Sequence, residues 1–532
     1  MARVRWYPPT LACQKDALLR TMKKHVIIIG AGIGGLSAAI RLGRHCRVTL
    51  LEKLPQVGGK LNICREPHPA RPGDRPFLFD TGPSLLTMPF VFLDLFAAAG
   101  QDVRDHLKIR RLDPVSRFVW ADGSTFSLHD DDLALHQELT RFAPDDREGW
   151  MQLLDRGRKV WELGESFLTH APEQLIKFDD WRAMGMITVP FRIGMFTKLF
   201  RTINRHVRNP RLRDILYQYA TYSGASPYHA PGTLAVIPWV EHYFGGWHIE
   251  GGMYRLAESL EGIAQSMGVE IRTNCPVSEV LVEAATARGV RLGDGTQLLG
   301  DAVIANSDVV YTYQHLIGRS HRRRYSDAVL ERFDPGGSGM VLMLGVEGTY
   351  PQLAHHTKFM PDDYRSELVA MFENRTIPQD PCIYVCAPTR TDPSLAPEGC
   401  EQLFVLVSAP PIQEGKIDWT IEGQKYRDKI IHTLQSRFGL TDLARRIVVE
   451  RRMTPVDFRS QYNANAGSIY GIASNSLRTA FMRPPNRDRD IKSLYFAGGA
   501  THPGGGLPLV ALSGRIVSEM ILKDFQIGDN CP

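Results

Sequence analysis

The 532-residue sequence has no uninterrupted run of about 18 apolar residues, so it does not predict a membrane-spanning helix. HExxH and GxSxG motifs with partner residues are also missing, and neither a metal centre nor a conventional catalytic triad is predicted. A net charge of +5 is small for this length, which argues against nucleic acid as a partner. The eight cysteines lack zinc-type spacing and are interpreted as buried thiols in a reducing compartment: Cys13, Cys46, Cys64, Cys275, Cys382, Cys386, Cys400 and Cys531.

One histidine pair could suggest a ligand set, but the sequence favours a simpler interpretation. His355 and His356 are adjacent, and no cysteine or acid follows at a spacing typical of a metal motif. We therefore expect a polar pair at the surface.

The first recognisable structural unit begins at residue 25. An apolar run over 26–29 predicts a buried strand, and a glycine-rich turn then leads into a helix. A second strand over 48–51 ends at Glu52. This βαβ opening predicts a doubly wound parallel sheet of the Rossmann type, an α/β fold.

Antiparallel and helical segments are expected between the parallel units. Asp-Gly pairs at 122–123 and 294–295 predict β-hairpins over 118–128 and 289–298. A segment rich in helix formers, 150–222, predicts a helical insertion. A second sheet is expected from the apolar runs 340–346, 382–387 and 403–408, and the C-terminus predicts a strand over 493–497 and a helix from Pro508 to about residue 523.

At this length we expect two intimately connected domains after a disordered N-terminal extension, residues 1–24. The nucleotide-binding domain would be discontinuous, with segments 25–105, 250–315 and 485–532. A domain for substrate and membrane contact would comprise 106–249 and 316–484.

The turn after the first strand carries a dinucleotide-binding fingerprint. Gly30 permits the tight turn, Gly32 lets the backbone approach a pyrophosphate, and Gly35 allows close packing of helix on sheet. The helix N-terminus would offer N–H donors to phosphate, and Glu52 would accept hydrogen bonds from ribose hydroxyls. Both FAD and NAD use this fingerprint.

Further segments resemble the FAD-dependent amine oxidase and carotene desaturase superfamily. Gly58-Gly59-Lys60, Asp80-Thr81-Gly82-Pro83 and above all the glycine-rich segment 495–508 resemble its bacterial-type carotenoid desaturases. So do 305–313, 353–357, 395–400, 418–420, 454–459 and 483–488, in that order, so the resemblance covers nearly all of 24–523. It implies an amine oxidase/GDI-like fold and FAD held by Gly30, Gly32, Gly34, Gly35, Glu52, Lys53, Gly58, Gly59, Lys60, Gly82, Pro83, Gly498, Gly499, Pro508, Leu509 and Val510.

The resemblance also implies a function in carotenoid biosynthesis. It predicts desaturation of an acyclic carotene, phytoene or a related C30 or C40 polyene, by hydride transfer to flavin with proton loss in an apolar tunnel. Oxygen or quinone would accept the electrons. In the family an Asp and an Arg near the helical insertion have been considered for acid–base roles, which points to Asp180 and Arg182. His502 lies in the glycine-rich segment 495–508 and is a further candidate for a catalytic role beside the flavin ring.

Several alternatives remain open within and outside that family. The terminal-methyl oxidases and the desaturases of hydroxylated or methoxylated carotenoids share these motifs, and 507–515 departs from the usual phytoene desaturase sequence. A flavin amine oxidase, a redox-neutral carotenoid isomerase and a non-catalytic GDI-like binding protein are further possibilities. The oligomeric state is not predicted.

A basic and apolar segment, 182–213, has the composition of an interfacial helix on anionic lipid. It contains seven arginines, one lysine and many apolar side chains before its first acid, Asp214. The alternative is a core helix with a solvated basic face. Because the expected substrate partitions into bilayers, we expect the protein to be cytoplasmic and bound peripherally to the inner membrane.

Overall fold

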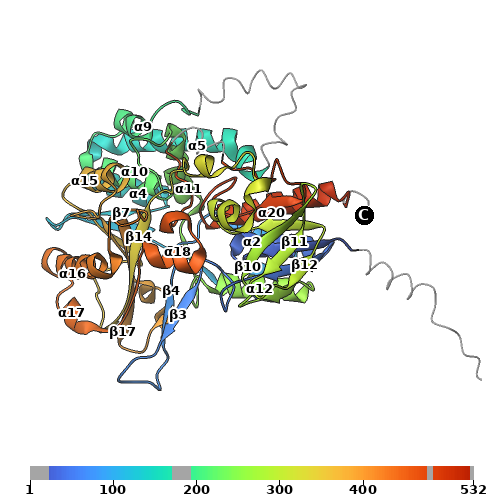
Figure 1. Cartoon of the computed structure of the whole chain (residues 1–532). Coiled ribbons are helices and arrows are strands. Elements are labelled where there is room, and N and C mark those ends of the chain that lie inside the picture. Colours follow the sequence, from blue (N-terminus) through green and yellow to red (C-terminus); the bar gives the residue numbers. More distant parts are fainter. Residues whose placement is uncertain (1–22, 171–192, 476–482, 528–532) are drawn as a thin grey trace, which may run out of the picture.

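The computed structural model describes residues 23–170, 193–475 and 483–527 (Figure 1). Its first sheet has five parallel strands in the order β19-β13-β1-β2-β9. These strands come from three distant parts of the chain: β1 (His25–Ile29), β2 (Arg47–Leu51), β9 (Glu270–Arg272), β13 (Ala302–Ala305) and β19 (Leu494–Phe496). The predicted Rossmann-type parallel sheet is confirmed. The domain boundaries stay a prediction, and the extension proposed for 1–24 lies almost wholly outside the described residues.

A larger mixed sheet lies beside the parallel one, with the order β18-β14-β17-β16-β15-β6-β7. Its strands are β6 (Ser116–Val119), β7 (Thr125–Leu128), β14 (Ser338–Glu347), β15 (His356–Phe359), β16 (Ile383–Cys386), β17 (Cys400–Ala409) and β18 (Ile447–Met453). Both predicted hairpins form, since β6 pairs with β7 and, in a separate three-stranded sheet, β11 (Thr286–Leu292) pairs with β10 (Val277–Glu283) and β12 (Gln297–Leu299). Two small sheets complete the strands: β3 (Ile63–Glu66) with β4 (Phe77–Asp80), and β5 (Ile109–Arg111) with β8 (Trp247–Ile249).

Helices cover both sheets (Figure 1). Those packed around the parallel sheet are α2 (Ile33–Gly43), α3 (Phe90–Ala98), α12 (Arg255–Ser266) and α20 (Leu507–Asp524), and α16 (Trp419–Phe438) packs on the mixed sheet. A third group is α4 (Asp132–Phe142), α5 (Arg147–Thr169), α9 (Leu199–His206), α10 (Pro210–Thr221) and α11 (Val236–Phe244). The described part of the predicted helical insertion is therefore helical, in α5, α9 and α10.

The described part of the basic segment is a core helix with an exposed basic side. Leu199 and Ile203 of α9 are each 1% exposed, whereas Arg201 and Arg205 face solvent. Phe196, just before the helix, is 59% exposed. The apolar side of α9 therefore packs inward, and membrane binding by the basic segment stays a prediction.

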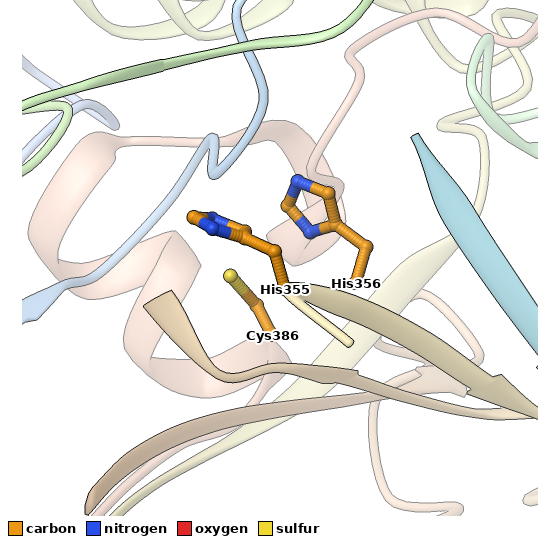
Figure 2. Close-up of side chains that lie close together, drawn as sticks. All are labelled: His355, His356 and Cys386. Carbon is orange, nitrogen blue, oxygen red and sulfur yellow. The ribbon is translucent and has the colours of Figure 1, made fainter. Parts of the chain in front are cut away.

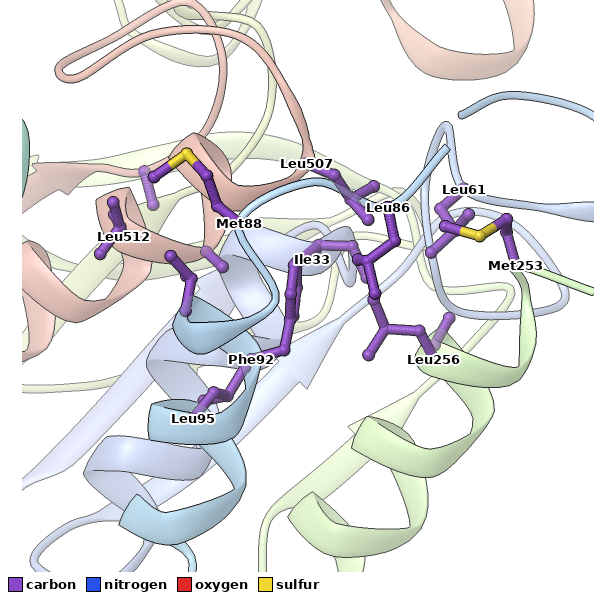
Figure 3. Close-up of a cluster of buried hydrophobic side chains, with 14 of the residues drawn as sticks. Ile33, Leu61, Leu86, Met88, Phe92, Leu95, Met253, Leu256, Leu507 and Leu512 are labelled. Atoms are coloured by element: carbon purple, nitrogen blue, oxygen red, sulfur yellow. The ribbon is translucent and has the colours of Figure 1, made fainter. Parts of the chain in front are cut away.

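One core contact joins the two ends of the chain. In Figure 3, Ile33 at the start of α2, Phe92 and Leu95 of α3, and Leu507 and Leu512 of α20 belong to one buried apolar cluster. At the closest approach, a Cβ added to Gly514 of α20 would lie 2.4 Å from the carbonyl oxygen of Gly34. The helices can approach this closely only because position 514 has no side chain.

We expect Gly514→Ala to lower the stability of the protein by about 1–3 kcal/mol, because the added methyl group forces α2 and α20 apart. The measurement is the thermal unfolding midpoint. Gly262→Ala is the matched control, because Gly262 is also helical and an added Cβ there meets nothing within 4 Å. The control should leave the midpoint unchanged or raise it, since alanine favours helix over glycine. Equal effects of both substitutions would contradict the importance of this contact.

Candidate cofactor and substrate cavity

A cavity of about 1000 Å³ runs between the two sheets. Its lining includes the loop between β1 and α2, Glu52 and the glycine-rich loop before α20. It also includes residues of the mixed sheet and of the helices α5 and α11. Segments that are far apart in the sequence therefore meet in one continuous space.

The β1–α2 loop has the geometry that a phosphate group needs. Helix α2 begins after Gly32, and no side chain caps its first turn, so these backbone N–H groups can serve a ligand. A Cβ on Gly35 would lie 2.2 Å from the Gly30 carbonyl oxygen. The Asn306 side-chain amide donates to that same carbonyl at 3.0 Å, which fixes the turn.

Glu52 lies at the end of β2, as predicted, and is 5% exposed. Its two carboxylate oxygens accept hydrogen bonds from the backbone N–H groups of Ala31 (2.8 Å) and Leu54 (2.9 Å). Burial raises the pKa of Glu52, and these two bonds oppose the rise. The carboxylate is thus held in place beside the β1–α2 loop, and it lines the cavity.

The lysines that follow bind backbone from a different part of the chain. The Lys53 ammonium donates to the Ser460 carbonyl and to the Asn463 side chain, both at 2.8 Å. The Lys60 ammonium donates to the carbonyls of Ser468 (3.1 Å) and Ile469 (2.6 Å), and burial lowers its pKa to about 8. Both lysines thereby tie this loop to residues 460–469. The predicted cofactor residues around them also line the cavity: Gly58, Gly59, Gly82 and Pro83.

The C-terminal glycine loop brings a second helix N-terminus to the cavity. Helix α20 begins after Gly506, again without a side-chain cap, and Pro508, Leu509 and Val510 of its first turn line the cavity together with Gly498 and Gly499. The dipole of this helix favours negative charge at that point.

A half-buried arginine supports this loop, and the sequence did not single it out. The Arg483 guanidinium donates to the Gly499 carbonyl at 3.2 Å and to the Ser474 hydroxyl at 2.8 Å. Burial lowers the pKa of Arg483 to about 10. Arg483 lies in segment 483–488, which indicated only the resemblance to carotenoid desaturases. No local sequence pattern distinguishes a partly buried arginine from an exposed one.

His502, a predicted catalytic residue, makes structural contacts. Its Nε2 lies 3.1 Å from the carbonyl oxygen of His170, at the end of α5, and its ring packs edge-on against Phe167. Burial lowers the pKa of His502 to about 4. The neighbouring Pro503 and Gly504 line the cavity, whereas the described lining does not include the His502 ring. The other two candidates, Asp180 and Arg182, lie outside the described residues, so all three catalytic roles stay predictions.

A polar cluster that the sequence did not predict lies at the inner wall of the cavity. Lys358 of β15 is 7% exposed, and its ammonium donates to the Tyr222 hydroxyl at 2.9 Å. It also lies 5.1 Å from the ring centres of Phe118 and Tyr222. Burial lowers the pKa of Lys358, and the nearby Glu241 opposes this. Glu241 itself is buried and accepts a hydrogen bond from Tyr219 at 2.6 Å.

The outer part of the cavity is apolar. Helices α5 and α11, the turn 232–235 and the segment before α9 contribute mostly apolar side chains, together with the Trp161 indole and the Thr233 hydroxyl: Val160, Phe167, Leu168, Ile193, Leu234, Val236, Ile237 and Val240. A long hydrocarbon could be bound there by shape and apolar contact.

The histidine pair expected at the surface is buried. His355 is 5% exposed and His356 is 1% exposed, so the prediction of a surface pair is wrong. The reason is strand pairing: β15 lies between β16 and β6 inside the mixed sheet, so its side chains face packed layers on both sides.

These features fit FAD. Two uncapped helix N-termini open into one cavity, a close-packed glycine turn leaves room for a pyrophosphate, and a fixed carboxylate stands where a ribose would bind. Within the described residues, no helix is both long and apolar enough to cross a bilayer.

Comparisons with known proteins agree with this arrangement. The model of the family "Flavin containing amine oxidoreductase" matches residues 33–522. The chain is 36% identical to a 4,4'-diapolycopene oxygenase from Methylomonas sp over 94% of this chain and 99% of that one, and 34% identical to a 4,4'-diaponeurosporene oxygenase from Staphylococcus aureus over 94% and 98%. A solved putrescine oxidase variant shares the fold, with a TM-score of 0.60, 14% identity and coverage of 94% and 99%. The chain therefore belongs to the flavin-containing amine oxidoreductase family, among the enzymes that resemble bacterial carotenoid desaturases, and is an FAD-dependent oxidoreductase.

Proposed function

We propose that this enzyme oxidises an acyclic carotenoid at the end of its polyene chain, with a C30 compound as substrate and oxygen as acceptor. In the net reaction a terminal methyl group and one O₂ give an aldehyde and one water. The relatives named as oxygenases of 4,4'-diapolycopene and 4,4'-diaponeurosporene support this substrate class. Bound FAD would supply the redox chemistry.

The observation that carries the proposal is a buried lysine in the cavity wall. A pure hydrocarbon offers no acceptor for the Lys358 ammonium, and removing this charge from water costs free energy. An aldehyde or carboxylate oxygen at the chain end would accept a hydrogen bond from it. Tyr470 also lines the cavity, and its carbonyl oxygen lies 3.0 Å from a Cβ placed on Gly505 of the glycine-rich loop before α20.

The remaining residues would orient the substrate and exclude water. The apolar side chains of α5 and α11 would bind the polyene, and the polar cluster at Lys358 and Tyr222 would hold its oxidised end. Glu52, the two glycine loops and the start of α20 would hold FAD. Removal of hydrogen from the carotene chain, as in a desaturase, is the second candidate, because the same apolar cavity suits it.

Membrane contact is part of the proposal, since the substrate partitions into lipid. The exposed Phe196 stands next to Lys198, Arg201 and Arg205, and Ile193 nearby lines the cavity. An exposed aromatic side chain with basic neighbours suits an anionic bilayer surface near the cavity.

Expression in bacteria that accumulate 4,4'-diapolycopene should give pigments in which an end group has lost two hydrogens and gained one oxygen, as measured by mass spectrometry. Bacteria that accumulate phytoene or its C30 analogue provide the contrast. Loss of hydrogen without gain of oxygen in those strains would instead establish a desaturase, and unchanged pigments in all strains would contradict both functions.

Glu52→Leu should reduce the FAD content of the purified protein at least about tenfold, because the ribose would lose a charge-assisted hydrogen bond of about 1.5–3 kcal/mol. The ratio of flavin absorbance to protein measures this. Glu270→Leu is the control, an acid on the neighbouring strand β9 that is bonded to Arg272 and Thr49. An unchanged ratio in Glu52→Leu would show that this carboxylate does not bind the cofactor.

Lys358→Met should lower kcat/KM for oxidation of the chain end about 10–100-fold, because a hydrogen bond from a charged group is lost while the volume of the side chain is kept. FAD content should stay unchanged. The control is Lys425→Met, at a lysine whose side chain is 67% exposed. Full activity of Lys358→Met would remove the main support for an oxygen-bearing end group.

A further inference from the structure

A second group of side chains, at the cavity wall formed by β15 and β16, has no role in the proposed function. One ring nitrogen from each of His355 and His356 and the sulfur of Cys386 all lie within 4.8 Å of one another, and all three residues are buried. Figure 2 shows these three side chains gathered at the ends of neighbouring strands. Strand pairing fixes the group, because His356 lies opposite Cys386 in the β15–β16 pair and the Ala387 N–H donates to the His355 carbonyl.

In each of the two histidine rings, one nitrogen forms a hydrogen bond and the other is available to bind a ligand. Nδ1 of His355 lies 2.8 Å from the Thr391 hydroxyl, and Nδ1 of His356 lies 2.7 Å from the Tyr384 hydroxyl. Nε2 of both rings has no hydrogen-bond partner among the described residues, although both are buried. A buried polar atom without a partner costs about 1–3 kcal/mol, so the described side chains leave an unmet requirement at this point.

The ligand types suit a borderline divalent metal. Histidine nitrogen and cysteine sulfur are zinc ligands. A histidine that binds a metal through one ring nitrogen usually forms a hydrogen bond through the other. Here Thr391 and Tyr384 are the hydrogen-bond partners of His355 and His356. In a tetrahedral zinc site the ligand atoms are about 3.3–3.8 Å apart, and the three candidate ligand atoms here lie within 4.8 Å of one another.

We propose that His355, His356 and Cys386 bind a zinc ion. His356 and Tyr384 also line the cavity, and the Ser84 hydroxyl lies 2.7 Å from that of Tyr384. The ion would hold the adjacent ends of β15 and β16 together at the cavity wall that also carries Lys358. Three protein ligands leave a fourth position on the metal for water or another oxygen.

The test is the metal content of the holoenzyme, produced without an affinity tag and washed with chelator. We expect one zinc per chain, and occupancy should fall at least about tenfold in Cys386→Ser and in His355→Gln. Cys400→Ser is the matched control, because Cys400 is also a buried thiol on a strand, hydrogen-bonded to Arg71, and its loss should leave the zinc in place. Thr391→Val should weaken zinc binding about 10–100-fold by releasing the ring of His355.

Cobalt replacement in the unmodified protein provides a readout that needs no variant to fold. A cobalt-minus-apo difference spectrum should show a thiolate-to-metal charge-transfer band, together with ligand-field bands at wavelengths beyond the flavin absorption. Absence of bound metal after incubation with zinc would overturn the proposal. So would zinc that survives both ligand substitutions, or a cobalt spectrum without the thiolate band. Each result is independent of which carotenoid the enzyme oxidises.

Discussion

The close contact between α2 and α20 is the constraint on which the site depends. The Ser37 hydroxyl donates to the Ala511 carbonyl at 2.8 Å across 474 positions of sequence, next to the Gly34–Gly514 approach. Because α2 starts at the first glycine loop and α20 starts at the last one, this contact brings two helix N-termini to one cavity. Both N-termini attract negative charge, which suits a cofactor with a pyrophosphate at one end and an electron-rich ring at the other.

The parts of the site that could be predicted from the sequence are those encoded locally. A strand, a glycine turn, a helix and an acid at the end of the next strand form one continuous segment, so Gly30, Gly35 and Glu52 can be recognised without a structure. The same holds for the hairpins, whose Asp-Gly pairs specify a turn within four residues.

The rest could not be predicted because it depends on contacts between distant segments. The partner of Lys358 is Tyr222, 136 residues away, and no pattern around either residue indicates burial. Local composition also misled the interpretation of His355 and His356, since two polar residues in a row usually mark a surface, whereas here the central position of β15 in its sheet buries them. Sheet order, which the sequence does not state, decides both cases.

The electrostatic character of the cavity distinguishes between substrates within the family. Lys358 is a buried cation and Arg483 is a half-buried one, and two helix N-termini add positive potential. Buried acids lie in the same region: burial raises the pKa of Glu52 and Glu241, and it raises that of Glu367 to about 7.

A protonated amine would enter such a cavity against this potential, which disfavours the amine-oxidase alternative although the fold is shared. A neutral polyene meets no such barrier. As its end is oxidised, the growing negative charge on oxygen would move toward Lys358, and the negative charge on the reduced cofactor would be stabilised by the start of α20. Under the proposed function, the buried cations would therefore disfavour a cationic substrate and would hold the oxidised end of a neutral one.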